Sequence, residues 1–260
     1  MLNKPYWLGF VFVSCLNSAI AAPTLVVLDP GHGGENLGAP SLHHPHQHEK
    51  DFTLPIAKLV QARLEAEGIE VVLTRQDDRE LTLLERVAIA NHARGTLLVS
   101  IHLNSSKRIG PSGPMTFLLS AGAAPESKRR MAMLEEEDPS VFPPDDARRP
   151  PSDLVRDILL GLIQQRSHER SLELAQSVQK HLAQASPFPG RGIRQEPFYV
   201  LMGVSMPAVV AEIGFINHPS EGKYITSPRG MRQIANGIAN GILAFDRRGH
   251  QSKKPPKEGK

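Results

Sequence analysis

The stretch Leu25-Val26-Val27-Leu28-Asp29-Pro30-Gly31-His32-Gly33-Gly34 is the key to the fold of this 260-residue chain. Its apolar, β-branched first half favours a buried strand. The glycines around His32 favour a turn that leaves a histidine at the carboxyl end of that strand. Open α/β sheets build their sites at the carboxyl ends of strands, so His32 is a candidate functional residue. Taken alone, His32 is equally well explained as a turn histidine that bonds to the backbone.

The apolar patterns after this stretch alternate between strand and helix. We expect strands at 70–74, 96–102, 115–120, 193–201 and 208–215, and helices at 50–68, 82–94, 154–163, 172–183 and 231–245. The fold class is therefore α/β: a single domain with a twisted, mostly parallel or mixed sheet of about six strands, right-handed crossovers, and helices on both faces. A proline-rich stretch at 121–151 interrupts this rhythm, and its second half is not expected to form regular structure.

The amino-terminal residues have the pattern of a secretory signal peptide. Lys4 precedes the apolar run 7–15, and the residues at 19–21 fit the A-x-A pattern of a cleavage site. The run is too short to span a bilayer. We therefore expect residues 1–21 to be removed, the mature chain to be exported, and no transmembrane segment in the mature chain. Lipidation at Cys15, the only cysteine, is the alternative, although the preceding residues match a lipoprotein site poorly.

The charge of the chain argues against nucleic acid as a partner. The formal net charge of +3 is small and dispersed, whereas nucleic-acid-binding proteins carry clustered basic surface. The basic carboxyl end has no large apolar residues, so we expect a disordered tail at 249–260. The folded domain is then expected at 22–248.

Two further residues of metal-ligand type stand at places comparable to that of His32. Glu49 precedes a helical pattern, and His102 closes the apolar run 97–101. Two histidines and a carboxylate are the ligand set of a catalytic zinc site that keeps one position for water. We therefore predict that His32, Glu49 and His102 converge on one Zn²⁺. Taken alone, Glu49 is explained as a partner of the helix dipole and His102 as a satisfied core side chain.

Glu212 lies within the apolar strand pattern 208–215. An ionised carboxylate in such a strand must be paired or must face a cation. A structural ion pair is one explanation. Beside a metal centre, a carboxylate can take a proton from an attacking water and later donate one to the leaving nitrogen. Glu212 is therefore the candidate catalytic base.

A second group of histidines, His43, His44, His46 and His48, lies in a polar loop. Alternating histidines in a proline-containing loop are typical of a flexible surface tract that binds metal weakly. His48 as a further ligand of the metal centre is the alternative. A nucleotide site near His32 is excluded, because the loop lacks the third glycine of a dinucleotide turn and the lysine of a P-loop.

With these residues the chain resembles the zinc-dependent N-acetylmuramoyl-L-alanine amidases of the type-3 amidase family, from about Leu25 to Phe245. The motifs that carry the resemblance are LDPGHGG at 28–34, EKD at 49–51, LTR at 73–75, SIHLN at 100–104, PAVVAEIGFINHP at 207–219 and GI at 237–238. The resemblance implies that His32, Glu49 and His102 bind zinc and that Glu212 is the catalytic base. The implied substrate is peptidoglycan, cut at the amide between N-acetylmuramic acid and L-alanine during cell-wall remodelling or daughter-cell separation.

The segment 121–166 resembles the insertion that cell-division amidases of this family place over the zinc cleft as an autoinhibitory helix. One of Glu135, Glu136 and Glu137 would then occupy the water position. An activator protein would dock on the apolar helical stripe at 154–163 and move the autoinhibitory helix away from the zinc. The stripe is equally well explained as ordinary helix core. We expect the active protein to be a monomer.

Two other functions use the same residues. A zinc peptidase or deacetylase could have the same three ligands and one carboxylate, and would differ in the bond that it opens. The second is a murein-binding module that has lost catalysis. Such a module is expected to lack a metal ligand or the base, whereas the three ligands and Glu212 are all present here.

Overall fold

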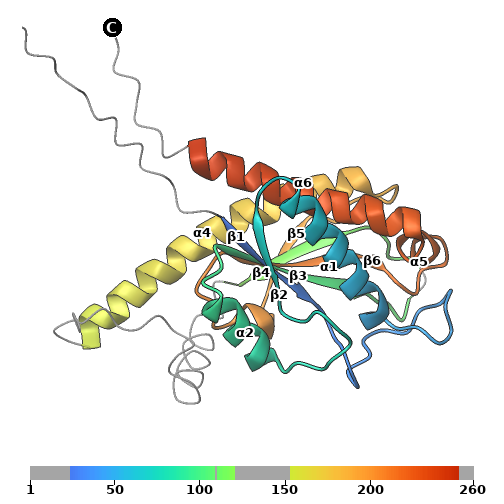
Figure 1. Ribbon diagram of the computed structural model, residues 1–260, viewed down its shortest axis with the longest axis horizontal. Coiled ribbons are helices and arrows are strands. Elements are labelled where there is room, and N and C mark those ends of the chain that lie inside the picture. The colour runs from blue at the N-terminus through green and yellow to red at the C-terminus, as the bar shows by residue number, and fades with distance from the viewer. Residues whose placement is uncertain (1–23, 109, 121–152, 252–260) are drawn as a thin grey trace, which may run out of the picture.

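A sheet of six strands, in the order β2-β1-β3-β6-β4-β5, forms the centre of the protein. The computed structural model describes residues 24–108, 110–120 and 153–251 (Figure 1). The strands are β1 (Leu25–Pro30), β2 (Glu70–Leu73), β3 (Leu97–Asn104), β4 (Met115–Leu119), β5 (Ile193–Glu196) and β6 (Ala208–Phe215).

Strand direction places the carboxyl ends of four neighbouring strands at one edge of the sheet. β1 pairs in parallel with β2 and β3, and β3 pairs in parallel with β6. β4 runs antiparallel to β6 and pairs in parallel with β5. The predicted mixed, mostly parallel sheet is therefore confirmed, and the loops after β1, β3 and β6 meet at the same edge.

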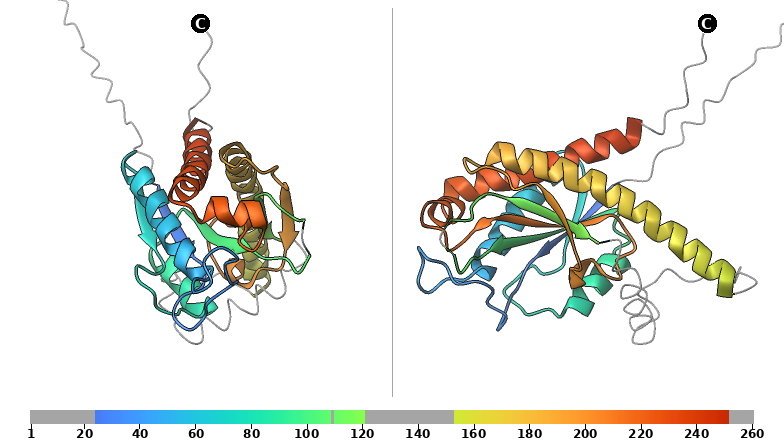
Figure 2. Two further views of the ribbon diagram at one scale, coloured as in Figure 1. Left: turned by 90° about the vertical axis from the view of Figure 1, so that its right-hand side faces the viewer. Right: turned by 180° about the vertical axis from the view of Figure 1, so that it is seen from behind.

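Helices cover both faces of the sheet, as predicted. One face is covered by α1 (Lys50–Glu65), α4 (Asp153–Ala185) and α6 (Pro228–Gln251), which lie side by side (Figure 2). The other face is covered by α2 (Leu83–His92) and the short 3-10 helix η3 (Tyr199–Leu201). Successive side chains of β1 point to opposite faces of the sheet. Val26 and Leu28 pack in the hydrophobic core under α1, α4 and α6, and Val27 packs in the core under α2 and η3.

Helix α4 is one continuous helix, so the prediction of two helices at 154–163 and 172–183 is wrong. Residues 164–171 contain neither glycine nor proline. The polar residues there interrupt the apolar spacing, but nothing in them interrupts the backbone hydrogen bonds of a helix. The amino-terminal part of α4 extends beyond the sheet (Figure 2).

The predicted strand at 193–201 is wrong in its second half, where the chain forms η3 instead. β5 ends at Glu196 because Pro197 follows and lacks the N–H group that would continue the ladder.

The last part of the chain contains more helix than the apolar pattern predicts. The short helix α5 (Pro219–Ile225) was not predicted, and its cap is His218, whose side chain accepts hydrogen bonds from two backbone N–H groups. Helix α6 continues to Gln251, past the predicted limit of the folded part at residue 248.

The predicted signal peptide at 1–21, with Cys15, lies outside the described residues. So do residues 121–152 of the predicted insertion, with Glu135, Glu136 and Glu137, and the tail beyond residue 251. Predictions for these segments, and for docking on the stripe at 154–163, stay predictions. In the part of the chain that the structure describes, no helix is both long and apolar enough to cross a lipid bilayer.

A buried ion pair connects β1 to its neighbours. Asp29 is fully buried and accepts hydrogen bonds from Thr74 Oγ1 at 2.6 Å, Ser100 Oγ at 2.7 Å and Arg86 Nη1 at 2.7 Å. Burial alone would raise the pKa of Asp29, but the Arg86 charge and the two hydroxyl groups outweigh it and lower the pKa. Arg86 also donates to the carbonyl of His32, so the pair fixes the loop that carries this histidine.

We predict that Arg86→Met lowers the free energy of unfolding by about 3–5 kcal/mol, because it leaves the Asp29 carboxylate buried without its ion-pair partner. Urea unfolding followed by circular dichroism measures the change. The control is Arg63→Met, which breaks an exposed pair with Glu67 and should leave the unfolding midpoint nearly unchanged. An Arg86→Met protein as stable as the wild type would contradict this role of the pair.

Candidate metal centre

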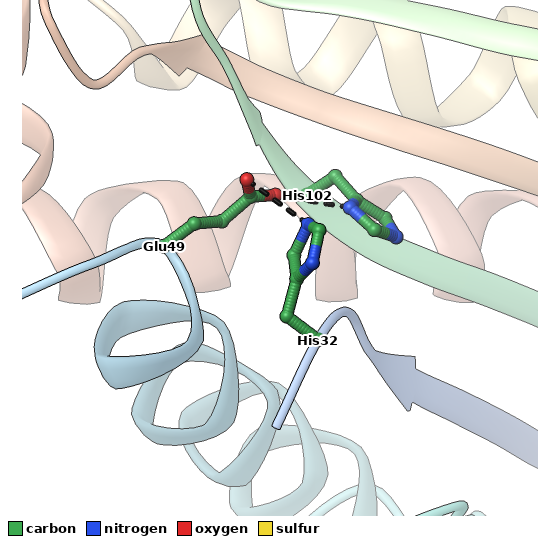
Figure 3. Close-up of side chains that lie close together, drawn as sticks. All are labelled: His32, Glu49 and His102. Atoms are coloured by element: carbon green, nitrogen blue, oxygen red, sulfur yellow. Dashed lines mark hydrogen bonds and ion pairs between the residues drawn. The ribbon is translucent and has the colours of Figure 1, made fainter. Parts of the chain in front are cut away.

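Three segments meet at the carboxyl edge of the sheet and bring His32, Glu49 and His102 together (Figure 3). His32 lies in the loop after β1, Glu49 immediately precedes α1, and His102 lies near the end of β3. One potential ligand atom from each residue lies within 4.8 Å of the other two. The three residues that the sequence singled out are thus neighbours in the fold.

The Glu49 carboxylate stands between the two imidazoles. Its Oε2 lies 3.1 Å from His32 Nε2, and its Oε1 lies 2.9 Å from His102 Nδ1. Only 4% of Glu49 is exposed, and the backbone N–H groups of Ala39 and Leu103 also donate to its oxygens. Burial alone would raise the pKa of Glu49, but the hydrogen bonds from His102 and His32 outweigh it and lower the pKa. The carboxylate is therefore ionised and held from four directions.

The donor set fits a zinc ion. Zinc binds histidine nitrogens and carboxylate oxygens at about 2.0–2.2 Å, so two ligand atoms of a tetrahedral site lie roughly 3.4 Å apart. The two histidine–glutamate distances are 3.1 and 2.9 Å, and the two imidazole rings lie edge to face with their centroids 4.9 Å apart. The three residues can therefore each supply one ligand atom to a single ion.

Contacts within the loop after β1 orient His32 as a candidate metal ligand. Its Nδ1 lies 2.7 Å from Asn36 Oδ1, an arrangement that keeps the ring proton on Nδ1 and leaves Nε2 available to a metal. The backbone of His32 has φ +61°, which is uncommon for a residue other than glycine. A Cβ atom at Gly38 would lie 2.7 Å from both Glu49 Cβ and His32 Cδ2. Asn36 and Gly38 were not predicted, because their roles depend on the path of the loop.

Glu212 lies on β6 directly beside His102 on β3. The two residues are partners in the parallel register, and partners in a sheet direct their side chains to the same face. Oε2 of Glu212 is buried and has no hydrogen-bond partner among the described residues. Burial is the main cause that raises the pKa of Glu212 to about 7; the charge of His102 acts against it and that of Glu49 adds to it. A carboxyl group of this kind suits proton transfer near neutral pH.

The histidine-rich loop packs against α5. His44 Nε2 lies 3.2 Å from Thr226 Oγ1, and His43 is partly buried beside Gly222. Among the described residues, the only cluster that could hold a metal is formed by His32, Glu49 and His102, and it does not include His48. His43 and His44 are thus partly buried rather than fully at the surface, because this part of the loop packs against α5; weak metal binding by the tract stays a prediction.

Comparison with known proteins identifies the family. The family model Amidase_3, described as N-acetylmuramoyl-L-alanine amidase, matches residues 26–244. The chain is 32% identical over 222 residues to the N-acetylmuramoyl-L-alanine amidase AmiA of Salmonella typhimurium, a match that covers 85% of this chain and 75% of the relative.

Two solved structures of amidases have the same fold. The N-acetylmuramoyl-L-alanine amidase from Clostridium difficile 630 is 29% identical, with a TM-score of 0.66 over 90% of this chain and 100% of that chain. The amidase AmiC2 of Nostoc punctiforme is 31% identical, with a TM-score of 0.63 over 86% of this chain and 98% of that chain. The resemblance seen in the motifs is thereby confirmed: the chain belongs to the N-acetylmuramoyl-L-alanine amidase family.

Proposed function

We propose that His32, Glu49 and His102 bind one Zn²⁺, and that Glu212 is the catalytic base for hydrolysis of the amide between N-acetylmuramic acid and L-alanine in peptidoglycan. Family membership supports the reaction and the substrate. The assignment of roles depends on one observation: Oε2 of Glu212 is buried beside His32, Glu49 and His102, and it has no hydrogen-bond partner in the described part of the chain. A carboxylate buried at such a cost is expected where a proton must be handled.

The residues divide the reaction between them. Bound zinc would polarise the amide carbonyl and lower the pKa of the attacking water. Glu212 accepts the proton that the water loses as its oxygen attacks the carbonyl carbon. The carbon–nitrogen bond then breaks, and Glu212 donates the same proton to the leaving nitrogen of L-alanine. Burial raises the pKa of this carboxyl group, which favours its role as a group that first accepts and then donates a proton.

We propose further that the protein is exported and acts as a monomer in the periplasm or cell envelope, in wall remodelling and the separation of daughter cells. The pattern at residues 1–21 supports export. Autoinhibition by Glu135, Glu136 or Glu137, and an activator that docks at 154–163, remain parts of the proposal.

We predict that Glu212→Gln lowers the rate of amide cleavage by about 10²–10⁴-fold, because the amide side chain cannot take a proton from water. The zinc content should equal that of the wild type, because Glu212 is not among the proposed ligands. Mass spectrometry of peptides released from purified sacculi measures the rate, and elemental analysis measures the zinc. The control is Glu196→Gln on the exposed edge strand β5, which should leave both unchanged. An active Glu212→Gln enzyme would remove Glu212 from this role.

We predict that a chelator lowers the melting temperature of the wild type and that added zinc restores it. A ligand that binds only the folded state stabilises it, by about 4 kcal/mol at a thousandfold excess over Kd. His102→Ala should show no zinc-dependent shift in scanning calorimetry. The control His46→Ala, in the exposed part of the histidine-rich loop, should keep the shift. A full shift in His102→Ala would exclude His102 as a ligand.

Product analysis separates the proposed amidase from a zinc peptidase or deacetylase. The amidase releases complete stem peptides that begin with a free L-alanine amino group. A peptidase would shorten the stem peptides, and a deacetylase would release acetate and leave the stem peptides attached.

A further inference from the structure

Arg75, which follows β2, is fully buried although it carries a charge. In the described part of the chain its guanidinium forms no hydrogen bond with a carboxylate. Its acceptors are neutral oxygens: Pro30 O, Gly31 O and Asp77 O at 3.0 Å, Thr53 Oγ1 at 3.0 Å and Lys50 O at 3.3 Å. The side chain is therefore committed to holding backbone rather than to pairing a charge.

The acceptors of Arg75 lie next to two of the three proposed metal ligands. Gly31 precedes His32, and Lys50 follows Glu49. One nitrogen, Nη2, donates to the carbonyls of both Gly31 and Lys50. The hydroxyl of Thr53 on α1 accepts from the same nitrogen and donates to Gly31 O at 2.8 Å. A single planar group thus connects the backbone beside one ligand with the backbone beside another.

This arrangement is costly. A buried guanidinium loses its hydration, and hydrogen bonds to neutral carbonyls return less than an ion pair would. Burial, with the nearby charge of Arg86, lowers the pKa of Arg75. Lysine cannot replace the planar fork, because its ammonium is a single point from which donors cannot reach acceptors spread over two segments. The gain that offsets the cost is geometric, since the fork fixes how far the loop after β1 lies from the start of α1.

We propose that Arg75 is a positioning residue, which sets the separation between His32 and Glu49 and so determines how tightly the centre binds metal. This inference rests on the proposed zinc site. Among the described residues, Arg75 forms no hydrogen bond with a ligand side chain, so it acts through the backbone at Gly31 and Lys50.

The variants Arg75→Lys and Arg75→Met test the proposal. The fold should survive both, because Pro30 O keeps a hydrogen bond from Arg86 at 2.9 Å and Gly31 O keeps the one from Thr53. Zinc affinity is measured by competition with a chromophoric chelator, and stability by urea unfolding of the metal-free protein. Groups that orient metal ligands typically contribute about 10–100-fold in affinity, so we expect both variants to bind zinc at least about tenfold more weakly. Lysine should not rescue the affinity, although it keeps the charge.

Two further readouts separate positioning from general stability. In the Co²⁺-substituted protein, visible absorption reports ligand geometry, and its intensity should change in the variants. At saturating zinc, kcat should fall more than KM rises, since the ligands are displaced but substrate contacts are not.

The matched control is Asn91→Ala on α2. Asn91 is also buried and holds backbone, by donating to Gly203 O at 2.9 Å and accepting from Ser205 N at 3.0 Å. Its acceptor and donor are not adjacent to any proposed ligand. We expect Asn91→Ala to lose stability but to keep the zinc affinity of the wild type.

Two outcomes would overturn the inference alone: zinc bound by Arg75→Met and Arg75→Lys as tightly as by the wild type, or an equal loss of affinity in Asn91→Ala. A wild-type protein that binds no zinc would overturn the proposed function, and this inference with it. The wild-type titration therefore distinguishes the two failures.

Discussion

The geometry of the site depends on the buried negative charge of Glu49. An ionised carboxylate that is 4% exposed must be surrounded by donors, or its desolvation would disrupt the fold. Its donors come from His32, Ala39, His102 and Leu103, which belong to the loop after β1 and to β3. The Glu49 charge has all four donors only when these segments meet, so the fold of this sheet edge and the His–Glu–His cluster depend on each other.

The meeting of these segments could be predicted from the sequence. Strands β1, β3 and β6 are buried on both faces, so each appears as a continuous apolar run that ends at a polar residue or a turn. In a parallel arrangement such ends lie at one edge, which brings His32 and His102 together. Glu212 was recognisable for a related reason: a carboxylate inside an apolar strand needs an explanation that surface glutamates do not.

Other features could not be predicted, because they depend on contacts rather than on pattern. The antiparallel direction of β4 cannot be predicted from its composition, since an apolar strand has the same residue pattern in either orientation. The continuity of α4 through residues 164–171 follows from the absence of a helix breaker, which apolar periodicity does not detect. The roles of Asn36, Gly38 and Arg75 depend on how the loop after β1 folds back on α1. The motif that contains Arg75 carries part of the family resemblance, but the hydrogen bonds of Arg75 go mainly to backbone oxygens, which any residue supplies.

Four carboxylates in the protein interior differ in their hydrogen-bond partners, and this difference supports the proposed role of Glu212. Asp29 has an ion pair and two hydroxyl donors, and its pKa is lowered. Glu49 has four donors, and its pKa is also lowered.

Glu221 is fully buried and its pKa is raised, so burial and pKa alone would make it as good a catalytic candidate as Glu212. However, the backbone N–H groups of the residues at 113 and 215 donate to the two oxygens of Glu221, which explains it as structural. Glu212 alone among these four keeps an oxygen that is buried and unpaired within the described residues, and that oxygen belongs to the side chain beside His102. Separation of neighbouring carboxyl groups into ionised and protonatable forms is how one site can hold a cation and move a proton at the same pH.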